Sequence, residues 1–280
     1  MKQAVKRSFI AALILLLCLS IAFVAQQYIE LSQPGVIVLL YHRVEQGGIG
    51  NKYTLRLSSF EEQLGYLHSQ GYKTILPKEI VKYVQHNPPK TIIISFDDGT
   101  ADHHDIVYPM LKKYGFKGVF FIISKYTDSP GSLNERQIRE MIKNGMEIGS
   151  HSYSHPLLDE MDISGIHYEL KKSKDDLEQI CGQKIVSFAP PGGWFDDRVV
   201  KVTRDVGYTA LFGCEIGVND LTKGPFVYKR IEVLSDLSLQ EFKDLLNPPK
   251  ILSYKVFQSL KVILHDLIGS KNYKKLASYP

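Results

Sequence analysis

Short apolar runs that alternate with amphipathic stretches are the feature that most restricts the fold of this chain of 280 residues. Runs rich in β-branched and aromatic residues predict strands that are buried on both faces. Apolar residues spaced three or four apart predict helices between these runs. Because a helix that joins two strands in this way makes them parallel, the alternation predicts an α/β fold with a mostly parallel sheet. The predicted strands are 36–40, 91–96, 118–123, 147–150, 185–189, 208–212 and 226–233.

About seven strands and roughly 250 residues favour a deformed (β/α) barrel over an open, doubly wound sheet. An open sheet of that kind binds nucleotides through a glycine-rich loop after its first strand, and no such loop follows residues 36–40. Two capping boxes, Ser59 with Glu62 and Asn134 with Gln137, predict helix starts. In a barrel, functional side chains belong at the carboxyl ends of the strands.

A charged and then apolar N-terminus predicts a membrane segment. Residues 9–25 are apolar except for one serine, and two lysines and an arginine precede them. This pattern keeps the first residues in the cytoplasm and carries the rest of the chain across the cell membrane. We therefore expect residues 1–31 to form a cytoplasmic N-terminus with a single-pass anchor or uncleaved signal, and residues 32–280 to form an extracytoplasmic domain with a C-terminal helical tail. Cleavage after Ala22, which would secrete the domain, is the alternative.

Charge and cysteine content restrict the partners of the predicted domain. The formal net charge is +4, of which three positive charges lie in the N-terminal segment, so the remainder carries about +1 (4 minus 3). That value excludes the basic surface typical of nucleic-acid binding. Beyond the N-terminal segment only Cys181 and Cys214 remain, and they form either one disulfide or two free thiols.

Acidic and imidazole side chains follow two of the predicted strands directly. Asp97 and Asp98 come after the strand 91–96, and His151 and His155 come after the strand 147–150. Because neighbouring strand residues point in opposite directions, we expect one aspartate to bind a metal and the other to handle a proton. Two imidazoles and a carboxylate suit zinc or a similar divalent ion and leave positions open for water and substrate.

These motifs carry a resemblance to a known family. Ser95-Phe96-Asp97-Asp98-Gly99 and His151-Ser152-Tyr153-Ser154-His155 resemble the first two motifs of NodB-type polysaccharide deacetylases, carbohydrate esterase family four. Leu40-Tyr41-His42-Arg43-Val44 resembles the opening strand of the subgroup that acts on poly-N-acetylglucosamine, and the resemblance extends over 36–233. It implies hydrolysis of N-acetyl groups on an amino-sugar polysaccharide, such as poly-N-acetylglucosamine, peptidoglycan or a chitin-like polymer.

The resemblance also implies roles for the residues of these two motifs. Asp98, His151 and His155 would bind the metal, with zinc favoured over cobalt or nickel, and Asp97 would be the general base. In the third motif Ala189 stands where many relatives have an arginine that orients the base. Arg230 is a candidate substitute for that arginine, or else a substrate contact or a solvated residue at the barrel edge.

The remaining candidates lie near the third motif or in the C-terminal tail. The backbone N–H of Gly192 is a candidate oxyanion donor. Trp194 is a candidate for stacking on a sugar ring, and Pro191 and His42 for other substrate contacts. His265 is the only late candidate for the general acid of the family, but the apolar residues around it are spaced for a helix.

Two alternative functions use the same scaffold. The departures from the third motif, and the absence of the Asp-Trp pair of many relatives, are compatible with a noncatalytic polysaccharide-binding or assembly protein. An O-acetyl esterase acting on a xylan-type polymer would use the same site. Retention of Asp98, His151 and His155 favours an enzyme over a binding protein.

Overall fold

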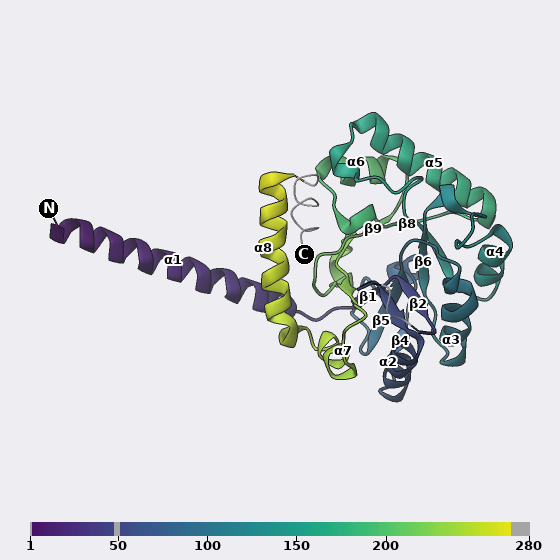
Figure 1. Cartoon of the computed structure of the whole chain (residues 1–280), viewed down its shortest axis with the longest axis horizontal. Coiled ribbons are helices and arrows are strands. Elements are labelled where there is room, and N and C mark those ends of the chain that lie inside the picture. The colour runs from purple at the N-terminus through teal and green to yellow at the C-terminus, as the bar shows by residue number, and fades with distance from the viewer. Residues whose placement is uncertain (1, 48–50, 270–280) are drawn as a thin grey trace.

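The computed structural model of the chain describes residues 2–47 and 51–269. A long N-terminal helix, α1 (Lys2–Leu31), projects from a rounded α/β domain, as Figure 1 shows. Residues Ala12–Leu31 of this helix are long and apolar enough to cross a membrane, by length and composition.

The domain is organised around one parallel sheet of nine strands. Its order is β10-β9-β8-β7-β6-β5-β1-β11, with β4 also paired to β5. The strands are β1 Ile37–Tyr41, β4 Lys73–Thr74, β5 Thr91–Phe96, β6 Val119–Ile122, β7 Glu147–Ser150, β8 Ser187–Phe188, β9 Ala210–Phe212, β10 Val227–Tyr228 and β11 Ile231–Glu232. A separate parallel pair consists of β2 Arg43–Glu45 and β3 Thr54–Arg56.

Helices surround the outer face of the curled sheet (Figure 1). They are α2 Leu57–Ser69, α3 Tyr108–Lys113, α4 Glu135–Lys143, α5 Ile163–Cys181, α6 Asp197–Asp205, α7 Leu239–Leu245 and α8 Leu252–Ile268. Short 3-10 or π helices lie at 77–83, 103–107, 124–126, 158–160, 191–193, 221–223 and 248–251. Alternate strand residues pack in two ways: Ile92 and Ile94 join the cluster that contains the helices, and Ile93 joins a second cluster inside the curl. The strands are therefore buried on both faces, as their composition predicted.

The sheet curls into a barrel, and its two edge strands, β10 and β11, follow each other directly in the chain. The strand predicted over 226–233 is interrupted, and only Lys229 and Arg230 separate β10 from β11. β10 pairs with β9 at one edge of the sheet, whereas β11 pairs with β1 at the other. The prediction of a deformed, nearly closed barrel is thus confirmed, with nine strands instead of about seven. The prediction of one continuous last strand is wrong, because the chain crosses the seam of the barrel there.

The two predicted helix starts have different outcomes. Asn134 caps α4, and its side chain and that of Gln137 exchange hydrogen bonds with each other's backbone, as predicted. The predicted N-cap at Ser59 is wrong, since the N-cap of α2 is Arg56, three residues earlier, and the helix follows β3 directly. The strand leads straight into the helix there, and Arg56 at the N-cap makes no side-chain capping bond.

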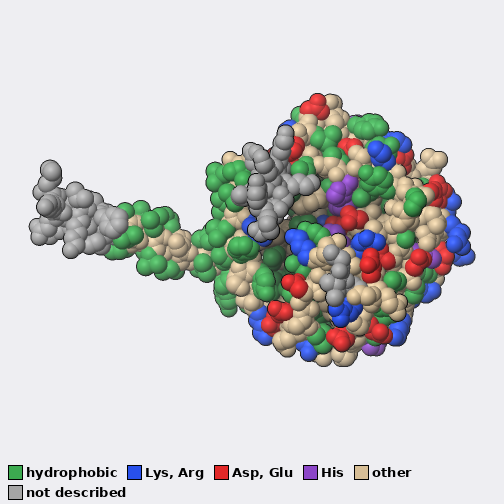
Figure 2. All heavy atoms as spheres, in the orientation of Figure 1, with side chains coloured by type: hydrophobic (Ala, Val, Ile, Leu, Met, Phe, Trp, Pro, Cys, Tyr) green, Lys and Arg blue, Asp and Glu red, His purple; other side chains and the backbone are tan. Residues whose placement is uncertain are grey.

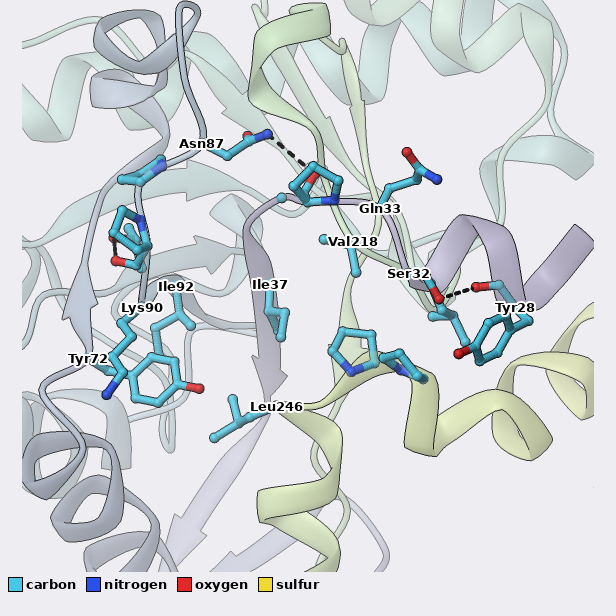
Figure 3. A pocket seen from close by; sticks show the side chains of 18 residues that line it. Tyr28, Ser32, Gln33, Ile37, Tyr72, Asn87, Lys90, Ile92, Val218 and Leu246 are labelled. Carbon is cyan, nitrogen blue, oxygen red and sulfur yellow. Dashed lines mark hydrogen bonds between the residues drawn. The ribbon is translucent and has the colours of Figure 1, made fainter.

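A cavity of about 700 Å³ opens at the amino ends of the central strands (Figure 3). Its lining includes Ile37 at the start of β1, Ile92 near the start of β5, and Tyr28 and Ser32 from the end of α1 and the link that follows it. Asp97, Asp98 and His151 follow the carboxyl ends of their strands. The cavity therefore lies at the opposite end of the barrel from these residues.

Glu147, the first residue of β7, is a buried carboxyl group in this fold. It accepts a hydrogen bond from the backbone N–H of Lys78, 3.1 Å away, but burial dominates and raises its pKa to about 7. An unfolded glutamate has a pKa near 4.5. The folded state therefore holds this proton more tightly, and its stability falls as pH rises from about 4.5 to about 7.

We expect Glu147→Gln to remove most of that pH dependence. The amide keeps the shape of the side chain without the charge, so the free energy of unfolding above pH 7 rises by roughly 3 kcal/mol relative to the parent chain. Urea unfolding measured between pH 5 and 8 checks this, with Glu160→Gln at an exposed position as the control. Parallel pH profiles for Glu147→Gln and the parent chain would contradict the assignment.

Candidate active site

The carboxyl ends of three neighbouring strands bring the predicted metal ligands together. β6 lies between β5 and β7, so the residues that follow β5 and β7 meet at one edge of the sheet. Oδ1 of Asp98 lies 3.6 Å from Nε2 of His151 and 3.6 Å from Nε2 of His155. The ligand atoms of the three side chains all lie within 4.8 Å of one another.

Backbone in the left-handed region turns these side chains toward one centre. Asp98 has φ 78°, His155 has φ 65° and Ser152 has φ 65°. They are three of the five non-glycine residues with positive φ in the described part of the chain, and such backbone is uncommon and costs free energy. Strained backbone is thus concentrated at the cluster, where contacts with the surrounding structure keep these residues in the left-handed conformation.

The turn at Asp98 also explains how two consecutive carboxylates serve one site. We expected Asp97 and Asp98 to point in opposite directions, as neighbours in a strand do. β5 ends at Phe96, and the positive φ of Asp98 brings its carboxylate toward His151, whose Nε2 also lies 4.0 Å from Oδ2 of Asp97. Simple strand alternation is therefore wrong at this position. Gly99 completes the exit, because a Cβ there would lie 3.2 Å from the Cα of Ile122 in β6.

The third motif orients His151 through a backbone carbonyl. Nδ1 of His151 lies 2.7 Å from the carbonyl oxygen of Ala189, which follows β8. Since a carbonyl only accepts hydrogen bonds, Nδ1 carries the proton and Nε2 keeps its lone pair for a metal ion. Ala189 therefore supports the site through its backbone, although it lacks the arginine side chain of many relatives.

Glu169 of α5 holds the loop between the two histidines, and it is not among the residues predicted from the sequence. Its buried carboxylate accepts hydrogen bonds from the backbone N–H groups of Tyr153 and Ser154 and from the hydroxyl of Ser154. The sequence contains a signal for this role. Glu169 stands three residues after Ile166 and beside Leu170, so it is an acidic residue on the apolar stripe of a helix.

The protonation of His155 suits metal binding. Partial burial and the adjacent imidazole of His151 lower the pKa of His155, although 39% of its side chain remains exposed. The imidazole is consequently neutral at neutral pH, which is the state that binds a metal ion. Its backbone N–H donates to the hydroxyl of Ser152, 3.0 Å away.

Asp97 forms a buried, bidentate ion pair with Arg230. Nη1 and Nη2 of Arg230 lie 2.7 and 2.9 Å from the two carboxylate oxygens, and Nε donates to the carbonyl of Gly213. Burial alone would raise the pKa of Asp97, but the guanidinium of Arg230 and then His151 lower it to about 2. Asp97 is therefore ionised throughout the physiological pH range.

The predicted contact between Arg230 and a substrate is corrected by this geometry. Arg230 is 0% exposed, because the seam between β10 and β11 places it inside the barrel. A solvated residue at the barrel edge is excluded for the same reason. The remaining interpretation, a substitute for the missing arginine of the third motif, agrees with its position. Sequence alone left this open because Arg230 and Asp97 are 133 residues apart.

The other candidates from the third motif lie around Gly192. Gly192 is exposed and has φ 66°, whereas Pro191 is buried, which leaves little of its surface for a substrate. Trp194 stacks on His265 of α8, with ring centroids 3.7 Å apart and an interplanar angle of 3°. Nε2 of His265 also lies 3.4 Å from Oδ2 of Asp159. The tail therefore forms a helix, as expected, and it brings His265 to the third motif.

Two further sequence predictions concern His42 and the cysteines. His42 follows β1 and is half-buried, with Nδ1 4.0 Å from Glu232 and its ring 4.8 Å from that of Tyr53. Its charge contributes to the low pKa of Asp97, so it lies near the site. Cys181 and Cys214 are both free thiols in the described structure, and the disulfide alternative is therefore wrong.

The donor set fits a divalent transition metal. Ligand atoms about 2 Å from a tetrahedral zinc ion lie roughly 3.3 Å apart, close to the separations between Asp98 and the two imidazoles. Two nitrogens and one carboxylate oxygen are donors that zinc, cobalt and nickel accept. Three protein ligands also leave coordination positions open, which distinguishes a catalytic from a structural site.

Residues 85–211 match the family model for polysaccharide deacetylase. With the curled parallel sheet and the residues at its carboxyl edge, this match shows that the chain carries a polysaccharide deacetylase domain. The family, the fold and the class of hydrolase predicted from the sequence are confirmed. Arg230 lies outside the matched residues, so its pairing with Asp97 comes from the structure alone.

Individual relatives agree with this assignment. The Bacillus subtilis protein YxkH is 29% identical over 219 residues, which cover 77% of this chain and 77% of that protein. A poly-β-1,6-N-acetyl-D-glucosamine N-deacetylase of Staphylococcus aureus is 24% identical over 216 residues, or 67% of this chain and 74% of that protein. The Streptococcus pyogenes deacetylase PplD in complex with acetate has the same fold, with a TM-score of 0.69, 24% identity, and coverage of 77% of this chain and 99% of that one.

We expect Arg230→Met to destabilise the domain by about 3–5 kcal/mol, because it leaves the carboxylate of Asp97 buried without its partner. The double variant Asp97→Asn/Arg230→Met should recover much of that loss, since no unpaired charge remains. Urea unfolding of the two variants and of Arg136→Met, an exposed control on α4, measures the difference. If Arg230→Met lowered the free energy of unfolding no more than the control does, the ion pair would not stabilise the domain.

Proposed function

We propose that the chain is a metal-dependent N-deacetylase of an amino-sugar polysaccharide, anchored in the cell membrane with its catalytic domain outside the cytoplasm. The observation that carries the proposal is the cluster of Asp98, His151 and His155 beside the ionised, arginine-paired Asp97. A carboxylate held next to three converging metal ligands is an arrangement suited to metal-assisted hydrolysis of an amide.

Asp98, His151 and His155 would hold the ion, with zinc favoured by the donor set and cobalt or nickel as alternatives. A bound divalent ion supplies Lewis acidity, which lowers the pKa of water from about 15.7 toward about 7 and polarises a carbonyl group. Asp97 then takes the proton of the attacking water. Arg230 keeps Asp97 ionised and fixes the direction of its carboxylate through two hydrogen bonds.

The third motif and α8 supply the groups for the later steps. In the proposal the backbone N–H of Gly192, in the exposed turn after β8, donates to the oxyanion that forms from the acetyl carbonyl. His265 protonates the departing amine, and Asp159 orients its ring. Trp194, stacked on His265, and His42, at the end of β1, border the place where the sugar would bind.

The preference for an amino-sugar polymer rests on the resemblance of the opening strand and on the Staphylococcus aureus relative, which is named for poly-N-acetylglucosamine. Peptidoglycan and chitin-like polymers remain within the proposed class. The proposed anchoring is supported by the apolar residues of α1 and by the positive charges that precede them, a pattern typical of a segment whose N-terminus stays in the cytoplasm.

We expect the full chain, loaded with zinc or cobalt, to release acetate from N-acetylglucosamine oligomers. Asp98→Ala should lose bound metal and acetate release together, because it removes one of three ligands. Asp175→Ala, at an exposed position of α5, is the matched control and should keep both. Chelation should abolish release, and added zinc should restore it.

The same assay separates the alternative functions. Binding of oligomers without metal and without acetate release would identify a noncatalytic polysaccharide-binding protein. Release from O-acetylated xylan but not from N-acetylglucosamine oligomers would identify an O-acetyl esterase. Acetate release that persists in Asp98→Ala would disprove the metal assignment.

A second experiment tests His265 as the general acid. We expect His265→Gln to lower acetate release from the oligomers by roughly 10²- to 10⁴-fold, because an amine leaves only when protonated. Hydrolysis of 4-nitrophenyl acetate should change little, since nitrophenolate departs without a proton. His167→Gln, at an exposed histidine of α5, is the control. Equal loss with both substrates would mean that His265 supports the structure of the site instead of donating a proton.

A further inference from the structure

The last described helix, α8, turns its apolar face away from the domain. Its exposed side carries six large hydrophobic residues, with Leu267 77% and Phe257 60% exposed. The six are Tyr254, Phe257, Leu260, Ile263, Leu264 and Leu267. Helical spacing places them on one broad face, where Lys261 is the only charged residue among the side chains that the structure describes.

The opposite face of α8 is polar and is packed against the domain. Lys255 is 1% exposed and bonds to Glu215 and to the carbonyl of Ile216. The side-chain amide of Gln258 bridges the carbonyl of Cys214 and the backbone N–H of Ile216. A surface helix of a water-soluble domain has the reverse arrangement, with its apolar face inward. The polarity of α8 therefore indicates that its outer face contacts something apolar.

The position of α1 identifies that partner. The segment Ala12–Leu31 contains 20 residues, which at 1.5 Å per residue extend over about 30 Å, the thickness of the hydrocarbon core of a bilayer. Its last turns contact α8: Gln27 accepts a hydrogen bond from Ser259, and Glu30 forms an ion pair with Lys255. With α1 inserted, the first half of α8 therefore lies at the level of the membrane surface.

The direction of α8 agrees with this placement. Figure 1 shows that α8 runs across the base of α1 instead of continuing along it. A helix that crosses the base of a spanning helix lies along the membrane surface. Figure 2 shows hydrophobic side chains along α1 and on the adjoining part of the domain. The apolar surface of the anchor thus continues onto the domain.

We propose that α8 is an interfacial helix, whose exposed apolar face lies in the outer surface of the lipid bilayer beside the anchor. This inference rests on the proposed insertion of α1. Interfacial helices bury such a face by about 5–10 Å at the boundary of headgroups and acyl chains. The amino group of Lys261 lies 4.6 Å from the ring centroid of Phe257, and in the proposal its long side chain lets this charge reach the lipid headgroups.

The proposed contact between α8 and the bilayer also fixes the position of the catalytic site relative to the membrane. The inner face of α8 carries His265, which stacks on Trp194, and Gln258, which bonds to the segment after β9. The membrane therefore holds one face of a helix whose other face forms part of the site. The barrel is oriented with this side against the membrane, so the polymer it acts on lies near the bilayer surface.

Tryptophan fluorescence in lipid tests the proposal, because the chain contains a single tryptophan. In a Trp194→Phe background, one tryptophan is introduced in the full chain by Phe257→Trp or Leu267→Trp on α8. Leu17→Trp reports on the anchor, and Tyr168→Trp, at an exposed position of α5, is the control. Each protein is reconstituted into phosphatidylcholine and phosphatidylglycerol bilayers with brominated acyl chains, which quench tryptophan on contact.

We expect loss of fluorescence at Leu17→Trp, Phe257→Trp and Leu267→Trp and none at Tyr168→Trp. Quenching at Leu17→Trp without quenching at either α8 position would overturn the interfacial helix and leave the anchor intact. Unquenched α8 positions in a chain that cross-links to a second copy through this face would assign the surface to dimerisation and likewise overturn it. Quenching at the α8 positions without quenching at Leu17→Trp would support the lipid contact and disprove the spanning anchor.

Discussion

The buried ion pair between Asp97 and Arg230 is the interaction on which the rest of the site depends. Each charge would be costly inside the barrel without the other, and the bidentate geometry satisfies both carboxylate oxygens. The pair also joins the first part of the sheet to its seam, since Asp97 follows β5 and Arg230 separates β10 from β11. The same contact thus keeps the proposed base ionised and links the end of β5 to the seam of the barrel.

Around this pair, the site combines strained backbone with a rigid support. Asp98 and His155 adopt left-handed backbone, which is unfavourable for residues with side chains, and the bonds from Glu169 and Ala189 oppose their relaxation. The fold itself therefore holds the converging ligands in position. The same surroundings keep Asp97 buried and leave His155 partly exposed, so the inner and outer sides of the cluster differ in access to water.

The helix α8 connects this chemistry with the anchor. Its polar face binds the segment after β9 and presents His265 to Trp194, and its first half contacts the end of α1. An inverted distribution of polar and apolar residues is expected where an apolar surface, and not water, covers the outside, and in the proposal that surface is the lipid bilayer. The 17-residue helix α8 therefore provides both the proposed contact with the membrane and His265, the proposed general acid.

Local patterns in the sequence determined the parallel α/β fold, the start of α4, the helical tail, the apolar N-terminus and the set of Asp97, Asp98, His151 and His155. These features follow from residues close together in the chain, whose spacing and composition carry the signal. Tertiary structure alone decided that Arg230 pairs with Asp97, that the last strand breaks at the seam and that the carboxylate of Asp98 turns inward. It also decided that Glu169 supports the histidine loop and that the apolar side of α8 faces outward. Each of these depends on contacts between distant segments, and propensity or periodicity cannot report which distant segments will meet.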